Sequence, residues 1–155
     1  MGKVLTIDEY KAMVGQELGV SGWLEIDQER VNAFADVTED HQFIHLDDAR
    51  AKAETPFGGT IAHGFLTLSL LSRLNPEVLP EIKDRVMTIN YGLNKVRFLN
   101  PVRVGSRIRS RATAGPVTEK APGQYLCEVT TVIEIEGADK PALIAEGLIM
   151  YVIGG

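Results

Sequence analysis

Cysteine, histidine and aromatic residues are scarce in this chain: its 155 residues include one cysteine and three histidines, and aromatic side chains make up 6%. A lone cysteine excludes an internal disulfide framework and suits a reducing compartment. The apolar run around residues 65–71 is too short to cross a bilayer, which takes ~20 residues. No apolar segment with a small-residue cleavage site opens the chain, so no signal peptide is expected. These absences predict a cytoplasmic protein that does not enter a membrane.

An excess of positive charge is also missing, because the net charge is -5. Without surplus cations to neutralise phosphates, general nucleic-acid binding is excluded, although a local arginine cluster can still hold a small anion. Hydrophobic residues make up 45% and charged residues 24%, as in ordinary globular proteins. The length suits one domain, and no repeat or linker divides the chain, so we expect a single domain over residues 1–155.

The first half of the chain is predicted to be mostly helical. Thr6 and Glu9 have the spacing of a capping box, which predicts a short helix to about Val14. Residues 22–26 are then expected to form a strand with a buried Trp23.

Further helix-capping residues follow. Asp27 can cap a helix that ends near Glu39, and three apolar residues of this segment have helical spacing: Val31, Phe34 and Ala35. Residues 40–45 are predicted to form a turn, after which Asp47 or Asp48 can cap another short helix. A loop at 56–59, rich in glycine and proline, precedes a helix predicted over residues 62–74. That helix is apolar on nearly every side, which indicates burial.

The second half of the chain alternates with a period of two, as β-strands do. Within each of three predicted strands, alternate residues are expected to share one face of that strand. The sets are Met87, Ile89, Tyr91 and Leu93; Arg107, Arg109 and Arg111; and Cys127, Val129, Thr131, Ile133 and Ile135. Cys127 is therefore predicted to be buried packing and not a nucleophile. The run 142–153 is evenly apolar, which is typical of a central strand. One buried helix followed by four long antiparallel strands predicts an α+β fold, with a curved sheet around one helix.

The segment 34–72 holds the residues suited to chemistry. Asp40 and His45 are five residues apart, and Gly64 opens the long apolar helix. A carboxylate and an imidazole can exchange protons near neutral pH, and a free amide at a helix start can hold a developing negative charge. Such a set suits a reaction at a thioester.

Two stretches resemble the hydratase motif of the MaoC-like dehydratases, the (R)-specific enoyl-CoA hydratases with the hot-dog fold. They are Phe34-Ala35-Asp36-Val37-Thr38-Glu39-Asp40-His41-Gln42-Phe43-Ile44-His45 and Ile61-Ala62-His63-Gly64-Phe65-Leu66. The family pattern is Asp-x-Asn-Pro-(Leu/Ile)-His, then a helix opening with His-Gly. Gln42 and Phe43 stand where the family has asparagine and proline, a variant similar to the branch of nodulation-protein-N-like members and mycobacterial 3-hydroxyacyl-thioester dehydratases.

The resemblance implies a hydro-lyase of fatty acid metabolism that adds water reversibly to trans-2-enoyl thioesters, equivalently dehydrating (R)-3-hydroxyacyl thioesters. It implies that Asp40 and His45 are catalytic and that the Gly64 amide binds the thioester oxygen. His63, Gln42 and Ser72 are the further candidates for oxyanion or substrate binding. No cofactor and no metal is implied, and the substrate is an acyl-CoA or an acyl-carrier-protein thioester. Relatives also imply a homodimer.

Each of these residues has a structural alternative. Asp40 can simply end a helix, His45 can cap the next one, and His63 can orient the loop instead of transferring protons. Gln42 can hold the catalytic pair as the family asparagine does, and Ser72 can be a small packing residue. The arginines at 107, 109 and 111 can bind coenzyme A phosphates or can form a solvated outer face of the sheet.

Two other functions remain open from the sequence. A thioesterase uses the same fold with a carboxylate or water acting on the carbonyl carbon, although His45 favours hydration because hydrolysis needs only one base there. A non-catalytic acyl-CoA-binding module is the other alternative, for which the Gln42 and Phe43 departures leave room.

Overall fold

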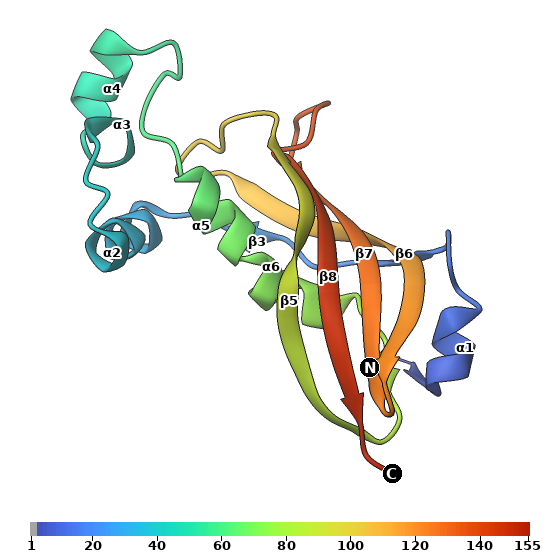
Figure 1. Cartoon of the computed structure of the whole chain (residues 1–155). Helices are drawn as coiled ribbons and strands as arrows, with labels where there is room; N and C mark the ends of the chain where they lie inside the picture. Colours follow the sequence, from blue (N-terminus) through green and yellow to red (C-terminus); the bar gives the residue numbers. More distant parts are fainter. Residues whose placement is uncertain (1–2) are drawn as a thin grey trace.

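The computed structural model describes residues 3–155 and consists of one large curved sheet with helices on its concave side (Figure 1). Four long strands form most of the sheet: β5 (Arg85–Phe98), β6 (Arg107–Ala121), β7 (Gln124–Ile135) and β8 (Leu143–Ile153). They are antiparallel, in the order β6-β7-β8-β5, so β8 is central as predicted and β5 is an edge strand. β2 (Glu17–Val20) and β3 (Leu24–Glu25) pair with β6 at the other side.

The apolar segment after the glycine loop forms two short helices in line. α5 (Gly64–Ser69) continues into α6 (Leu71–Leu74), and a 3-10 turn (Asn75–Glu77) follows. Figure 1 shows this green run lying across the sheet. Its buried side chains share a core with β6, β7 and β8, with these members: Leu66, Leu70, Leu74, Ile108, Ile133, Leu143 and Ala145. Burial of these apolar side chains provides the main stabilisation of the fold.

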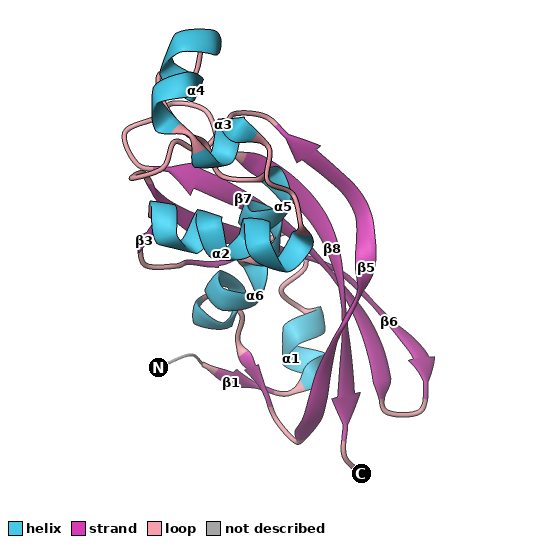
Figure 2. Ribbon diagram, turned by 90° about the vertical axis from the view of Figure 1, so that its left-hand side faces the viewer, coloured by secondary structure: helices cyan, strands magenta, loops and turns pink. Residues whose placement is uncertain are grey.

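Three further helices lie beyond the amino-terminal end of α5: α2 (Gln28–Thr38), α3 (Phe43–Leu46) and α4 (Asp48–Glu54) (Figures 1 and 2). The side chain of Asp27 accepts a hydrogen bond from the Arg30 amide and caps α2, while Asp47 caps α4 through the Arg50 amide. Both caps were predicted. Residues 40–45 are not only a turn, however, because the last three belong to α3.

A second, smaller core lies at the other end of the sheet. α1 (Ile7–Lys11) packs there, beside a parallel pair of short strands, β1 (Val4–Leu5) and β4 (Glu81–Ile82). The capping box of Thr6 and Glu9 is present. Cys127 is fully buried in this core, as predicted. No helix formed by the described residues has the length and apolarity needed to cross a membrane.

Three expectations about burial and facing were wrong. Trp23 is only half-buried, because it lies at the surface with the Arg109 guanidinium over its ring, 4.4 Å from the centroid. The α5 surface is not buried all round, since Phe65 is 69% exposed. In β5, pairing irregularities follow Asn90 and Leu93, so the side chains do not alternate evenly and Leu93 lines the same cavity as Asn90.

Candidate active site

The carboxylate of Asp40 lies just beyond the end of α2. Glu39 ends that helix in the left-handed conformation, with φ 60, and turns the chain back toward α5. Asp40 follows in a tight turn, where its Oδ1 accepts a hydrogen bond from the Gln42 amide at 3.3 Å. The side chain is exposed, so this carboxylate is open to solvent on one side.

His45 is held in place by contacts at both its ring and its backbone. Its Nδ1 lies 2.7 Å from the carbonyl oxygen of Ile61, and because a carbonyl only accepts, Nδ1 carries the proton. Nε2 of the neutral ring is then left with a free lone pair. The backbone carbonyl of His45 accepts a hydrogen bond from Gln28 Nε2 at 2.7 Å, and Thr60 donates to the Oε1 of that glutamine.

His63 connects the other two groups. Its ring stacks on His45 with centroids 3.7 Å apart, and it packs against Phe34. Its Nε2 lies 3.0 Å from the backbone carbonyl of Asp40, so the ring supports the turn that carries the carboxylate. Nδ1 of His63 is buried and has no hydrogen-bond partner within residues 3–155.

These side chains bring three chemical groups close together. One ligand atom from each of Asp40, His45 and His63 lies within 4.8 Å of the other two. No hydrogen bond joins the Asp40 carboxylate directly to either imidazole in the described part of the chain, and a separation of up to 4.8 Å leaves room for one bridging water. Each histidine directs one ring nitrogen to a backbone carbonyl, which leaves its other ring nitrogen available to a ligand such as water.

The immediate surroundings bias His45 toward its neutral form. Burial lowers its pKa, the neighbouring His63 lowers it further, and the Ile61 hydrogen bond and the Asp40 carboxylate act in the opposite sense. The net effect is a pKa below the usual value. A neutral His45 can accept a hydrogen bond from water, which an imidazolium cannot.

A cavity of about 410 Å³ opens beside this group and is lined by both His45 and Gly64. Gly64 begins α5, where the first backbone amides have no partner within the helix. The Phe98 ring lies directly over this glycine, and a Cβ added there would come 3.1 Å from the ring. Glycine thus lets the Phe98 ring lie close against the start of α5, which a larger residue would prevent. Thr67, one turn further along α5, also lines the cavity.

The remaining sequence candidates are placed less centrally. Gln42 is the N-cap residue of α3 and donates its backbone amide to Asp40; within residues 3–155 its side chain makes no hydrogen bond to Asp40 or His45. Ser72 is exposed and lines a second cavity along α6, not the one that contains His45 and Gly64. His41 is half-exposed and pairs with Asp36.

The arginine stripe on β6 is engaged in ion pairs. Arg107 pairs with Glu136, and both Arg109 and Arg111 pair with Glu134. This arrangement matches the solvated outer face of the sheet, the alternative to phosphate binding. Near the cavity, Arg103 instead donates to the Phe57 carbonyl at 3.1 Å and fixes the glycine loop, in which Gly58 has φ +76.

Several contributors to the site were not anticipated from the sequence. Gln28 and Thr60 secure the backbone of His45, and Phe98 covers Gly64 from a strand thirty-four residues away in the chain. Such tertiary contacts leave no local pattern.

Comparison with known proteins gives consistent results. Residues 9–138 match the model of the family described as MaoC like domain. Nodulation protein N of Rhizobium meliloti (strain 1021) is 48% identical over 141 residues, which is 91% of this chain and 88% of that protein. The 3-hydroxyacyl-thioester dehydratase Z of Mycobacterium tuberculosis (strain ATCC 25618 / H37Rv) is 48% identical over 147 residues, which is 95% of this chain and 96% of that protein.

A similar solved structure is an (R)-hydratase from A. caviae, whose description places it in PHA biosynthesis. It superposes with a TM-score of 0.71 and is 30% identical, covering 88% of this chain and 94% of the other. The curved sheet around a helix is therefore the hot-dog fold, as the resemblance implied.

Proposed function

Because the chain belongs to the MaoC-like dehydratase family, we propose that it is a hydro-lyase acting on acyl thioesters, with Asp40 and His45 as its catalytic pair. The reaction is the reversible addition of water to a trans-2-enoyl thioester, which gives the (R)-3-hydroxyacyl product. The observation that carries this assignment is the convergence of the Asp40 carboxylate and the His45 imidazole within 4.8 Å, beside the cavity lined by Gly64.

The geometry supports a definite division of roles. A water between Asp40 and His45 donates one hydrogen to the carboxylate and the other to the free Nε2 of the imidazole. Asp40 takes a proton as the water oxygen bonds to C3, and the pair returns one proton to C2, so that the elements of water are added on one face. Between these steps the Gly64 amide holds the enolate-like oxygen of the thioester. We assign His63 a positioning role, because its ring contacts the Asp40 carbonyl and stacks on the His45 ring.

A hydration assay with crotonyl-, octenoyl- and dodecenoyl-CoA tests the proposal. We expect the conjugated ultraviolet absorbance to fall with the wild-type protein, and Asp40→Asn to lose ~10²–10⁴ in rate because the base is removed. Asp36→Asn, an exposed aspartate on α2, is the matched control and should retain activity.

Other results would point to other functions. Full turnover by Asp40→Asn would remove the base assignment. Release of free thiol would indicate a thioesterase, and tight binding without loss of absorbance would indicate a non-catalytic module. Parallel assays with carrier-protein thioesters identify the carrier that the protein uses.

We also propose a homodimer formed through β5. This edge strand carries exposed apolar side chains that a second copy would bury, among them Met87, Ile89 and Tyr91, which are 50%, 42% and 56% exposed. A bare apolar edge strand favours pairing with another chain. Sedimentation should give twice the subunit mass, and Tyr91→Lys should shift the equilibrium toward the monomer. A monomeric wild-type protein at micromolar concentration would contradict this.

A further inference from the structure

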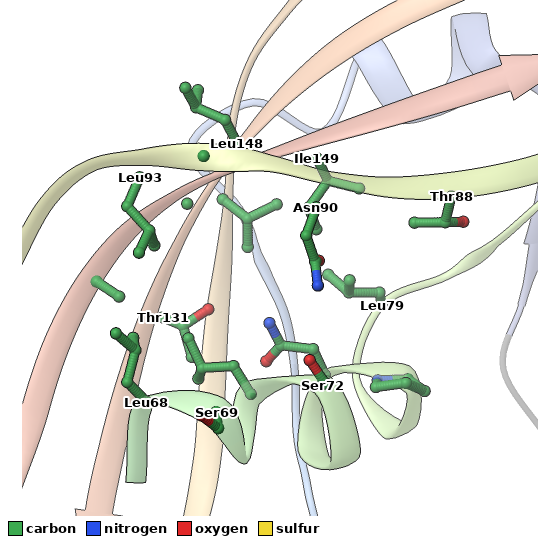
Figure 3. Close-up of a pocket in the computed structure, with 17 residues that line it drawn as sticks. Leu68, Ser69, Ser72, Leu79, Thr88, Asn90, Leu93, Thr131, Leu148 and Ile149 are labelled. Carbon is green, nitrogen blue, oxygen red and sulfur yellow. The ribbon is translucent and has the colours of Figure 1, made fainter. Parts of the chain in front are cut away.

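A second cavity, of about 510 Å³, lies between the α5–α6 run and the sheet (Figure 3). Helix α5 and strand β5 line both this cavity and the catalytic one. On α5, Thr67 lines the catalytic cavity and the next residue, Leu68, lines the second. On β5, Phe98 lines the first and Leu93 the second. We take the second cavity as the place of an acyl chain that extends from a thioester held at Gly64, because α5 and β5 contribute to the walls of both cavities.

The end of this cavity nearest the catalytic site is mostly apolar. Leu68, Leu93 and Ala145 line it, with the hydroxyls of Thr131, which is only 2% exposed, and of Ser69, which already donates to the Phe65 carbonyl. Thr131 and Ala145 are neighbours because Thr131 on β7 pairs with Ala145 on β8. Methylene groups of an acyl chain match such walls.

The far end has polar groups among its apolar ones, because two amide side chains line it beside Leu79 and Ile149 (Figure 3). Asn75 follows α6, and Asn90 lies on β5, whose Thr88 adds a hydroxyl at the same end. The Oδ1 of Asn75 accepts a hydrogen bond from the fully buried Ser110 at 2.9 Å, which leaves the amide N–H groups of Asn75 for another partner. Figure 3 shows the amide of Asn90 and the hydroxyl of Ser72 directed toward the interior of the cavity from opposite walls.

An acyl chain that ends in a methyl group is poorly matched to the polar groups at this far end of the cavity. Polar groups covered by an alkyl chain lose their water without gaining a hydrogen bond, which is costly. An oxygen atom on the ligand would replace that water. From this gradient we infer that the cavity selects acyl chains carrying a hydrogen-bonding oxygen, such as a hydroxyl, beyond the apolar stretch. The inference rests on the proposed function, because it assumes an acyl thioester at Gly64.

Matched pairs of trans-2-enoyl-CoA substrates test it, each pair differing only in a terminal methyl or hydroxymethyl group, over lengths from hexenoyl to dodecenoyl. We expect kcat/KM of the hydroxylated member to exceed that of the plain one by about tenfold at lengths that reach Asn75 and Asn90, the effect of one net hydrogen bond. The ratio within each pair cancels any general change in catalysis.

Variants locate the effect. Asn90→Leu should lower the ratio to about one, since one net hydrogen bond is lost, and Thr88→Val provides a milder test at the same end if Asn90→Leu does not fold. Asn94→Leu is the matched control, because Asn94 is on the same strand but donates to Glu128 away from the cavity, and its ratio should equal that of the wild type.

A wild-type ratio at or below one at every length would overturn the inference while leaving hydration intact. Absence of hydration with every substrate, crotonyl-CoA included, would instead overturn the proposed function.

Discussion

The imidazole rings of His45 and His63 are stacked, with their planes 22° apart and their centroids 3.7 Å apart. The neighbouring His63 ring lowers the pKa of His45, in the same direction as burial does. Both rings are buried. The stack thus helps to keep His45 neutral, which its proposed role in holding water requires.

The pH dependence of hydration should reflect this stack. Because the pKa of His45 is lowered, chiefly by burial and then by His63, kcat/KM should fall only as the pH drops below the usual histidine range, when Nε2 becomes protonated. His63→Phe keeps an aromatic ring but removes the titratable neighbour, so the pKa of His45 should rise and the acid limb should move to higher pH. His41→Phe, at an exposed histidine, should leave the profile unchanged. An acid limb that stays in place in His63→Phe would contradict this account.

Replacing the His45 ring should be more damaging than replacing an exposed histidine. In His45→Gln the side-chain amide can still donate to the Ile61 carbonyl, which limits structural damage, but the free imidazole nitrogen is lost. We expect hydration to fall by ~10²–10⁴, with little change in thermal midpoint. His41→Gln serves as the control and should stay near wild-type activity; equal activity in the two variants would argue against His45.

Adding a methyl group at Gly64 should disturb the proposed oxyanion position through Phe98. A Cβ there lies 3.1 Å from the Phe98 ring, so the ring or the start of α5 must shift. We expect Gly64→Ala to lose ~10² in kcat/KM, comparable to loss of one oxyanion donor. Combining it with Phe98→Leu should restore part of the activity, because the contact is relieved. If the double variant lost as much kcat/KM as the two single variants together, the steric explanation would be wrong.

Cys127 should be unreactive in the folded protein. Burial raises the pKa of its thiol to about 12, so the thiolate is scarce at neutral pH as well as inaccessible. A thiol reagent should label no site in native protein and one site in denaturant. Rapid labelling of the native protein would show that the strand interior opens readily.

The sequence predicted the parts of the fold that depend on local chemistry. The Asp27 and Asp47 caps and the Thr6 capping box are specified by short-range hydrogen bonds, and they were placed correctly. Period-two alternation likewise located the long strands. It failed within β5, where pairing irregularities after Asn90 and Leu93 disturb the alternation without leaving a sequence signal.

The site was predictable in its residue types but not in its connections. The spacing of Asp40 and His45 and the following Gly64 indicated a shared site, and the structure brings these groups together. His63 contacts the carbonyl of Asp40, twenty-three residues away in the chain, and Ser72 on α6 lines another cavity. Such outcomes are decided by tertiary packing.

Phe98, which covers Gly64, belongs to the same edge strand whose bare apolar side chains are proposed to meet a second subunit. A wall of the reaction chamber is thus supplied by the least supported strand of the sheet. If pairing steadies that strand, specific activity per subunit should decline on dilution below the dissociation constant, and mass action should restore it on reconcentration. The fraction of protein that is dimeric would then set the rate of turnover per subunit.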